Sequence, residues 1–313
     1  MERKVVLAVD IGGTKYSVGL VRESGAIISK HKYTWRHISE ESVVTEICAA
    51  IQGILAENPR CVISSIGITI TGLTDPVTGS WISAVYMGIY SLPIGKIIRE
   101  RFSFPVYVEN DCNASAMAEK MFGLCKRTDH FLYISIGNGI GGALYLDGKL
   151  YRGAFGAAGE IGNCRVDEIS SKKRGTRKRD TLENLASARG IVETYIGLGG
   201  KKKIDGEAPD ALVVAKMAKE GDQTACEAFQ IEGRYLGQII ASSCMLLNPE
   251  KVIIGGGVAM SYELFKESLL EIVTQETRIF AMGTPAKIQV TALGYDSGLL
   301  GAAAVALQEG GQI

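Results

Sequence analysis

The sequence lacks an excess of charge of either sign, because its 34 Lys and Arg residues are matched by 34 Asp and Glu residues. A balanced chain has no global basic field to attract nucleic acid or an anionic membrane, so neither is expected as a partner. It also lacks an apolar stretch long enough to cross a bilayer, and no basic-then-apolar leader precedes the first strand-like run. We therefore expect a cytoplasmic protein that acts on small molecules.

Closely spaced cysteine pairs are absent as well. The seven cysteines are scattered, and an odd number argues against a disulfide framework, so we expect reduced thiols. Cys112 has no histidine near it in the sequence that would make it a nucleophile. No Gly-Lys-Ser/Thr sequence is present, which excludes a Walker A loop.

What is present is enough chain for two domains with a core each, since 46% of the 313 residues are hydrophobic. Apolar spacing and turn residues predict strands 4–10, 17–21 and 26–33, helix 39–58, strand 62–68, helix 93–101, strand 106–109 and helix 113–121. The resulting order is β-β-β-α-β-α-β-α, which indicates an α/β fold.

The same plan begins again at residue 130. Strand 130–136, a Gly-rich turn and strand 143–146 repeat the opening of the chain. Helices dominate beyond residue 182, and the predicted elements there are helix 222–247, strands 251–254 and 287–292, and helix 299–307. We interpret this pattern as an internal duplication, whose two Gly-rich turns are expected to face each other across a cleft and hold a polyphosphate.

The first candidate site residues lie in the turn Asp10-Ile-Gly-Gly-Thr-Lys15 at the end of a predicted strand. Gly12 and Gly13 let backbone N–H groups approach phosphate oxygens, and Thr14 and Lys15 can add donors. Asp10 can hold a hydrated Mg²⁺. The alternative is an ordinary Gly-Gly hairpin without a ligand.

Two further glycine clusters follow predicted strands. Gly137-Asn138-Gly139 opens a Gly-rich run that a strand follows, where a Rossmann fingerprint would need a helix. This run is either a phosphate-binding turn or a tight hairpin. Gly256 and Gly257 lie between a strand and a helix, where the backbone can approach a nucleotide base or ribose.

A carboxylate and an amide lie where a predicted strand passes into a helix, in the sequence Glu109-Asn110-Asp111-Cys-Asn113. Asp111 can simply cap the following helix. With phosphate-type turns elsewhere in the chain, the alternative is a base that accepts the proton of a substrate hydroxyl.

Together these segments resemble the ROK family of sugar kinases and sugar-responsive repressors. Residues 10–15 are similar to the family's first phosphate loop, and PVYVENDCNASAMAE at 105–119 is similar to its catalytic segment. Residues 136–162, with GNGIGG and GKLYRGAFGAAGEIG, resemble its second phosphate loop and sugar-binding stretch. LENLAS at 182–187, VIIGGGV and GLLGAAAVA are further matches, so the resemblance covers nearly the whole chain.

The resemblance implies a two-domain actin-like (ribonuclease H-like) ATPase fold with an interdomain cleft. The expected lobes are 1–117 plus 297–313, and 118–296. It also implies a cytoplasmic transferase that uses ATP and Mg²⁺ to phosphorylate a sugar hydroxyl, usually the 6-hydroxyl of a hexose. A homodimer or larger homo-oligomer is expected.

By the same resemblance, each site residue receives a role. Asp111 is the catalytic base, and Asn110, Glu160 and Glu183 bind sugar hydroxyls. The ATP-binding residues are Asp10, Gly12, Gly13, Thr14, Lys15, Gly137, Asn138, Gly139, Gly256 and Gly257, with Asp10 reaching Mg²⁺ through water.

The sequence departs from the family pattern after Glu160. Asn163 stands where many members carry a sugar-contacting His, so Asn163 is expected to contact the sugar instead. The family's zinc site has no counterpart, because Cys164 is the only cysteine between Cys125 and Cys226, and no zinc is predicted. The region holds a basic segment, 172–179, which is expected to be a solvated loop.

The substrate is left open by a second departure. Val85 stands where the family's sugar-contacting Asn is expected, so a substituted or amino sugar or a glycoside is a candidate besides glucose. A sugar sensor or repressor is an alternative, although such proteins carry a helix-turn-helix where only nine residues precede Asp10. A degenerate kinase that binds sugar without turnover is another.

Overall fold

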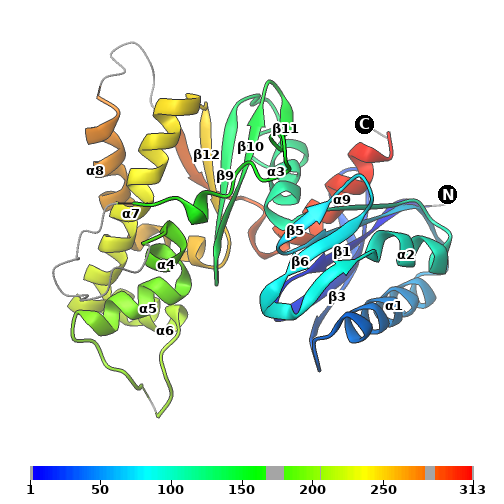
Figure 1. Cartoon of the computed structure of the whole chain (residues 1–313), viewed down its shortest axis with the longest axis horizontal. Helices are drawn as coiled ribbons and strands as arrows, with labels where there is room; N and C mark the ends of the chain where they lie inside the picture. Colours follow the sequence, from blue (N-terminus) through cyan, green and yellow to red (C-terminus); the bar gives the residue numbers. More distant parts are fainter. Residues whose placement is uncertain (1–2, 167–179, 205, 279–285, 312–313) are drawn as a thin grey trace. The chain divides into compact units, whose positions relative to one another are not determined.

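The computed structural model describes residues 3–166, 180–204, 206–278 and 286–311. The chain divides into two compact units, the first made of Met1–Arg127 with Ala292–Ile313 and the second of Thr128–Thr291. Each unit has its own β-sheet with helices packed on it (Figure 1). Within the described residues, no helix combines the length and apolar character needed to traverse a bilayer.

The first unit is built on a five-stranded sheet in the order β3-β2-β1-β4-β8. Its strands are β1 (Arg3–Ile11), β2 (Lys15–Val21), β3 (Ile27–Thr34), β4 (Cys61–Ile70) and β8 (Val106–Asn110). β1 to β3 form an antiparallel meander, whereas β4 runs parallel to both β1 and β8. The carboxyl ends of β1, β4 and β8 therefore meet at one edge of the sheet.

Three short strands that the sequence did not predict lie between β4 and α2 (Ile94–Phe102). They are β5 (Leu73–Asp75), β6 (Ser80–Ala84) and β7 (Ile89–Leu92), and they form a separate antiparallel sheet. Strands of three to five residues interrupted by Gly and Pro give no clear alternation. Trp81 anchors this sheet, because its buried indole donates a hydrogen bond to the Thr71 carbonyl at 2.9 Å.

Helices cover both faces of the first large sheet. On one face, α1 (Glu40–Glu57) and α2 share a core with the β1 residues Leu7 and Val9. On the other, α9 (Ser297–Glu309) packs on β1 and β4, with α3 (Asp111–Met121) beside it. Gly67 of β4 permits this approach, since any Cβ there would collide with the Ala302 carbonyl of α9.

The second unit repeats this sheet. Its order is β11-β10-β9-β12-β13, with β9 (Phe131–Ile136), β10 (Ile140–Leu146), β11 (Lys149–Tyr151), β12 (Lys251–Gly255) and β13 (Lys287–Val290). When the strands of each five-stranded sheet are numbered along the chain, both sheets have the order third, second, first, fourth and fifth, with an antiparallel meander followed by parallel strands. The predicted internal duplication is therefore confirmed.

The helices of the second unit share one hydrophobic core with the β9 residues Leu132 and Ile134. They are α4 (Leu182–Ala186), α5 (Ala188–Gly197), α6 (Ala211–Lys219), α7 (Gln223–Leu247) and α8 (Lys266–Glu276). α7 lies alongside α8 (Figure 1), and Gly237 allows the close contact, because a Cβ there would lie 2.7 Å from Cβ of Ile272. α7 ends at Asn248 in the left-handed conformation, at the predicted stop before Pro249.

The unit limits differ from the predicted lobe limits. The predicted boundary at 117 falls inside α3, whose residues all belong to the first unit, and the observed division follows Arg127. The return to the first unit occurs at Ala292 instead of 297. The predicted basic segment, 172–179, lies outside the described residues.

Candidate active site

At the carboxyl edge of the first sheet, Asp10 of β1 lies beside Thr69 of β4. The Thr69 hydroxyl donates a hydrogen bond to Asp10 Oδ1 at 2.9 Å. Asp10 also contacts Gly298 in α9, where a Cβ would lie 2.6 Å from either carboxylate oxygen. Burial raises the pKa of Asp10, and the hydrogen bond from Thr69 opposes that rise. The site thus holds a carboxylate in a partly desolvated position at the start of the first Gly-rich turn.

The first Gly-rich turn is closed by backbone and side-chain hydrogen bonds. The Gly12 N–H donates to the Lys15 carbonyl at 3.0 Å, and Trp35 Nε1 donates to the Gly12 carbonyl at 2.9 Å. Thr14 and Lys15 are exposed. The turn is therefore a fixed loop between β1 and β2 whose predicted donor side chains face solvent.

Asn110, at the end of β8, is the N-cap of α3. Its Oδ1 accepts hydrogen bonds from the N–H groups of Cys112 and Asn113 at 2.9 and 3.2 Å, and its Nδ2 donates to the Gly72 carbonyl at 3.0 Å. Asp111 is the first residue of α3 and is partly exposed. Asn110 is therefore the N-cap, and Asp111 Oδ1 also accepts a hydrogen bond from the Cys112 N–H at 2.8 Å.

A buried carboxylate, Glu109, supports this segment from within. Its Oε1 accepts hydrogen bonds from the Asn110 N–H at 2.8 Å and from Asn113 Nδ2 at 3.0 Å. Glu109 is 1% exposed. The sequence motif contained Glu109 but gave it no role, and the structure shows that it fixes the backbone on either side of Asp111.

Two residues that the sequence did not single out complete this part of the first unit. Tyr86 lies in the 3-10 helix η1 (Val85–Met87), and its hydroxyl donates to Thr71 Oγ1 at 2.8 Å. The Tyr86 ring lies on Gly13, where a Cβ would meet ring carbon Cε2 at 2.7 Å. Thr71 adjoins Gly72, the partner of Asn110, so residues 71–72 connect the first turn to the segment that was predicted to be catalytic. No sequence periodicity marks these contacts.

In the second unit, the second Gly-rich turn is shorter than predicted. It comprises Gly137, Asn138 and Gly139, because β10 already begins at Ile140. The Gly137 N–H donates to the Gly139 carbonyl at 2.9 Å, and the Gly137 carbonyl accepts from the N–H of Ala188 in α5 at 2.9 Å. Asn138 is exposed at the tip. The turn corresponds to the first turn by its place between the first two strands of a sheet.

The Glu183 carboxylate contacts this turn directly. Its Oε2 accepts a hydrogen bond from the Ile140 N–H at 3.0 Å. Gly139 must be small here, because a Cβ would lie 2.6 Å from that oxygen. Glu183 therefore anchors the turn in addition to any contact that it makes with a substrate.

Glu160 and Asn163, both predicted to bind the sugar, lie together at the 3-10 helix η2 (Ile161–Asn163). Asn163 Nδ2 donates to Glu160 Oε2 at 3.4 Å, and both residues are exposed. The glycines around them hold this segment against β10, since a Cβ on Gly159 or Gly162 would collide with the β10 backbone. The structure thus brings Glu160, Asn163 and the second turn to one region of the second unit.

The third glycine cluster also reaches this region. Gly256 has a φ of +85°, and a Cβ on it would collide with the backbone of Ile136 at the end of β9. Gly257 follows it at the start of the 3-10 helix η4 (Val258–Leu264). Gly256 is therefore required both by its left-handed conformation and by the close approach of two strand ends.

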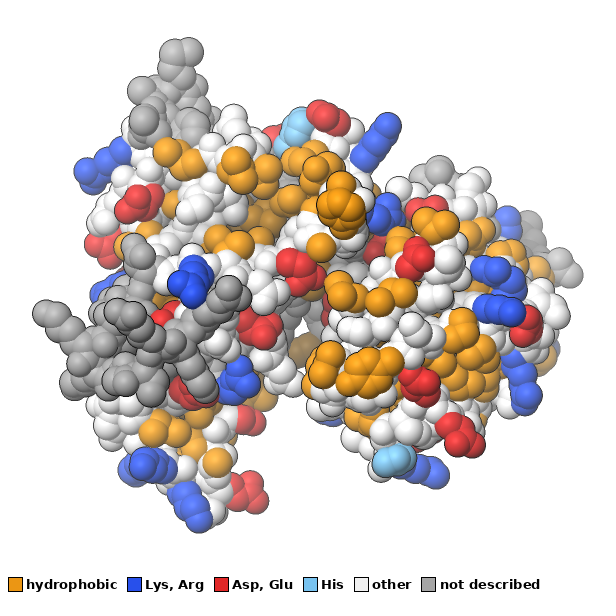
Figure 2. Space-filling view, viewed as in Figure 1, with side chains coloured by type: hydrophobic (Ala, Val, Ile, Leu, Met, Phe, Trp, Pro, Cys, Tyr) orange, Lys and Arg blue, Asp and Glu red, His pale blue; other side chains and the backbone are white. Residues whose placement is uncertain are grey.

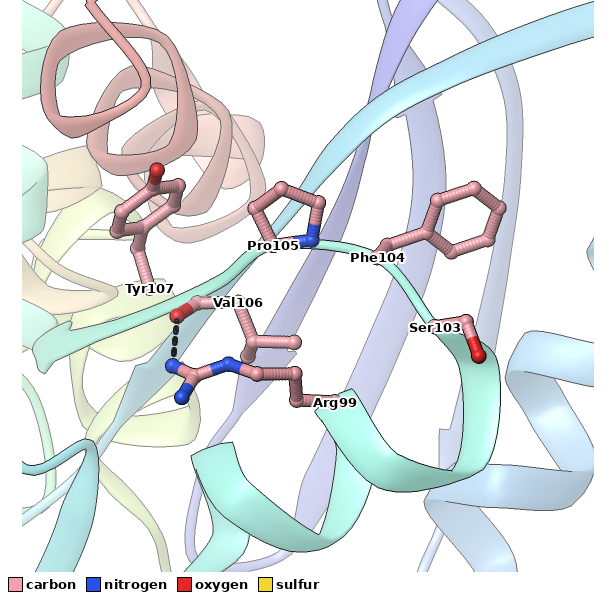
Figure 3. Close-up of a pocket in the computed structure, with 6 residues that line it drawn as sticks. All are labelled: Arg99, Ser103, Phe104, Pro105, Val106 and Tyr107. Carbon is pink, nitrogen blue, oxygen red and sulfur yellow. Dashed lines mark hydrogen bonds between the residues drawn. The ribbon is translucent and has the colours of Figure 1, made fainter.

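A surface pocket in the first unit lies elsewhere (Figure 3). It is lined by Arg99, Ser103, Phe104, Pro105, Val106 and Tyr107. Arg99 crosses it and donates from Nη2 to the Val106 carbonyl at 3.1 Å. Val106 begins β8, whereas Asn110 ends it, so this pocket is at the opposite end of the strand from the candidate catalytic residues.

The metal requirement of the site can be tested against the donor set. In the part of the chain that the structure describes, no group of three or more His, Cys, Asp or Glu residues could hold a metal ion. A single carboxylate such as Asp10, beside a phosphate-type turn, suits Mg²⁺, which keeps several waters and binds through one or two carboxylates plus substrate phosphates.

Comparison with known proteins assigns the chain to a family. The model of the ROK family matches residues 6–309. The chain belongs to the ROK family. Its two duplicated sheets accordingly have the actin-like ATPase fold of the solved ROK kinases.

The relatives of this chain include both repressors and sugar kinases. The chain is 31% identical over 262 residues to the xylose repressor of Caldicellulosiruptor bescii, covering 79% of this chain but only 63% of the repressor. It is 31% identical over 318 residues to Thermotoga maritima glucokinase, covering 97% and 98% of the two chains. Yersinia pestis N-acetylmannosamine kinase is 30% identical over 302 residues, covering 95% and 96%.

Among solved structures, a ROK family glucokinase from Streptomyces griseus in complex with glucose and AMPPNP superposes with a TM-score of 0.82 at 29% identity. The match covers 97% of this chain and 99% of that chain. Membership in the ROK family alone does not decide between a kinase and a repressor, so the activity rests on the site.

Proposed function

We propose that this ROK family protein is an ATP-dependent sugar kinase with Asp111 as its general base. The observation that carries the proposal is the register of the first sheet, in which Asp10, Thr69 and Glu109 occupy matching positions on adjacent strands. Adjacent strands lie about 4.8 Å apart, so Asp10 and the segment before Asp111 are separated by roughly 10 Å. That spacing suits a metal-binding carboxylate and a base acting on one phosphoryl group.

In the proposed reaction, Asp111 accepts the proton of a sugar hydroxyl as the hydroxyl oxygen forms a bond to the γ-phosphorus of ATP. The bond between that phosphorus and the oxygen shared with ADP breaks, and ADP leaves. Asn110 orients the sugar beside Asp111. Bound Mg²⁺, reached by Asp10 through water, would neutralise charge on the phosphates.

The remaining residues receive matching roles. Gly12, Gly13, Thr14 and Lys15 of the first turn and Gly137, Asn138 and Gly139 of the second would bind phosphates through backbone and side-chain donors. Gly256 and Gly257 would lie against the nucleoside. Glu160, Asn163 and Glu183 would accept or donate hydrogen bonds to sugar hydroxyls.

The relatives support a hexose or hexose derivative as acceptor. Phosphorylation of its 6-hydroxyl is part of the proposal. Glucokinases and an N-acetylmannosamine kinase align with this chain over nearly their full lengths. A cytoplasmic location, the absence of a nucleic-acid partner, and assembly as a homodimer or larger homo-oligomer belong to the same proposal.

The test is ADP release from Mg-ATP with a panel of hexoses and amino hexoses. Asp111→Asn is expected to lower kcat by about 10²- to 10⁴-fold, which is the usual contribution of a general base. Asp147→Asn, a control in a hairpin where the aspartate side chain is 92% exposed, should match the wild type. Full activity of Asp111→Asn would refute the base, and sugar binding without ADP release would favour a sensor.

A further inference from the structure

An exposed aromatic side chain lies among the residues proposed for catalysis in the first unit. Tyr86 is 67% exposed, and its neighbour Val85 is 70% exposed. Single exposed apolar residues are common and need no explanation. Tyr86 differs because two contacts fix it: the hydrogen bond from its hydroxyl to Thr71, and the packing of its ring on Gly13. A ring that is both exposed and held in place is a preformed surface for a ligand.

Tyr86 is connected both to the turn that is proposed to bind phosphate and to the segment that carries the proposed base. Its ring rests on the first turn, which is proposed to hold phosphate. Its hydrogen-bond partner Thr71 precedes Gly72, whose carbonyl accepts from Asn110 Nδ2 at 3.0 Å. Asn110 in turn precedes the proposed base, Asp111. An acceptor oxygen placed between the turn and Asp111 therefore brings the rest of the acceptor close to the Tyr86 ring.

The segment that carries Tyr86 exposes further apolar side chains. Hydrophobic side chains gather over the part of the first unit where β5 and β6 lie (Figure 2). The exposed large hydrophobic residues of the β5–β7 segment are Leu73, Val77, Ile82, Val85, Tyr86 and Tyr90. Grouped apolar side chains on a protein surface mark binding sites more often than isolated ones do.

We propose that Tyr86 is a specificity-determining residue, whose ring stacks on the apolar face of the acceptor sugar and, with Val85, favours a hexose that carries an N-acyl substituent over the plain hexose. This inference rests on the proposed kinase function. A pyranose presents C–H groups on its faces and hydroxyls at its rim, so an aromatic ring can cover a face while polar residues bind the rim. The methyl of an acyl group adds apolar area that Val85 can remove from water.

The experiment compares kcat/KM for N-acetylglucosamine with glucose, and for N-acetylmannosamine with mannose. The wild type is expected to prefer the acylated sugars. Tyr86→Ala should reduce that preference about tenfold or more, the scale on which an apolar contact discriminates between substrates. Tyr86→Phe keeps the ring and should retain most of the preference. Leu212→Ala, a control at a side chain that is 66% exposed on α6 of the second unit, should leave it unchanged.

Calorimetric binding of the same sugars separates this inference from the proposed function. Binding without phosphorylation, with the preference for acylated sugars lost in Tyr86→Ala, would refute the kinase and support the role proposed for Tyr86. Phosphorylation would support the kinase. The role proposed for Tyr86 would be overturned if the ratio of kcat/KM for acylated and plain sugars were equal in the wild type and Tyr86→Ala, or if the wild type preferred the plain hexose. A wild type that neither binds nor phosphorylates any of these sugars would overturn both.

Discussion

The Glu183 carboxylate accepts a hydrogen bond from the backbone N–H of Ile140 at 3.0 Å, and so connects α4 to the second Gly-rich turn. The same oxygen lies against Gly139, which has no Cβ to displace it. The sequence predicted Glu183 as a ligand of the sugar. Its contact with the turn means that replacing it is expected to alter phosphate binding as well.

Two substitutions at Glu183 separate these roles. Glu183→Gln keeps an oxygen that can accept from Ile140, so the KM for ATP should stay within a few-fold of the wild type. Glu183→Ala leaves the Ile140 N–H without this acceptor, at a cost of roughly 1–3 kcal/mol, and should raise the KM for ATP about tenfold. Steady-state kinetics with ATP varied at saturating sugar measure the difference. Equal KM values for ATP in both variants would show that Glu183 does not anchor the turn.

Gly13→Ala is expected to disturb the first turn through Tyr86. The added methyl would lie 2.7 Å from Tyr86 Cε2, so the ring must move and strain its hydrogen bond to Thr71. We expect kcat/KM for ATP to fall at least tenfold, because misplacing a phosphate-binding turn by a fraction of an ångström is costly. Kinetic assays of the purified variant measure this loss.

Gly53→Ala is the matched control for that substitution. Gly53 lies on the exposed side of α1, and a Cβ there meets nothing within 4 Å. Because alanine favours a helix, this change should raise the free energy of unfolding by about 0.5–1 kcal/mol and leave the kinetics unchanged. Equal activity of the two alanine variants would count against a tight fit between Gly13 and Tyr86.

Glu232 of α7 is a buried carboxyl that makes stability depend on pH. It is 1% exposed, and among the described residues neither of its oxygens has a hydrogen-bond partner. Burial raises its pKa well above the ordinary value of 4.5. The folded state therefore holds this proton more tightly than the unfolded state. The stability gained from the neutral carboxyl is complete below about pH 4.5 and is lost as pH rises through the folded-state pKa.

Glu232→Gln should remove this dependence. The free energy of unfolding of the wild type, relative to the variant, is expected to fall by up to about 1.4 kcal/mol per pH unit above pH 4.5, until the folded-state pKa is passed. Urea denaturation at a series of pH values gives the difference. Glu227→Gln removes an exposed carboxylate from the same helix and should follow the wild type. If the free energy of unfolding changed with pH in the same way in the wild type and Glu232→Gln, the proposed effect of burying Glu232 would be contradicted.

Asp10→Asn should impair metal use without weakening the fold. Because burial raises the pKa of Asp10, the ionised carboxylate is costly to the folded state, and asparagine can still accept the hydrogen bond from Thr69. We expect a several-fold higher Mg²⁺ concentration for half-maximal activity and an unchanged or higher melting temperature.

Asp75→Asn should affect the melting temperature and not the Mg²⁺ requirement, which is the opposite of the result expected for Asp10→Asn. The hydrogen bond from the Thr78 hydroxyl lowers the pKa of Asp75, so its ionised form is favoured in the folded state. Its replacement should lower the melting temperature slightly and leave the Mg²⁺ requirement unchanged. Magnesium titrations of ADP release and thermal scans test both variants, and an unaltered Mg²⁺ requirement in Asp10→Asn would remove Asp10 from the metal site.

Much of the fold was predictable because local signals determined it. The start of α1 at Ser39 carried a capping residue, and the structure confirms it with a capping box between Ser39 and Ser42. The repeated strand, turn, strand order likewise predicted the duplicated sheets. Strands β5 to β7 escaped prediction because their stability comes from pairing and from the burial of Trp81, which neighbouring residues do not reveal.

The candidate site was predictable as a set of residues but not as a set of contacts. The sequence named Asp10, the Gly-rich turns and Asp111, whose roles stay predictions. It could not show that Gly298 is kept small by Asp10, or that Glu183 bonds to Ile140, because these contacts join distant parts of the chain. Nor could it distinguish Asn110 from Asp111 as the cap of α3, since both residue types favour that position.

The place of α9 has a consequence for how the protein is made. This helix follows the second unit in the sequence yet covers the face of the first sheet that carries Gly67. During synthesis on the ribosome, the second unit is therefore complete while the first still waits for its final layer. Translation halted after residue 291 would leave bare sheet in the first unit for chaperones and proteases to recognise, even though the second unit could already have folded.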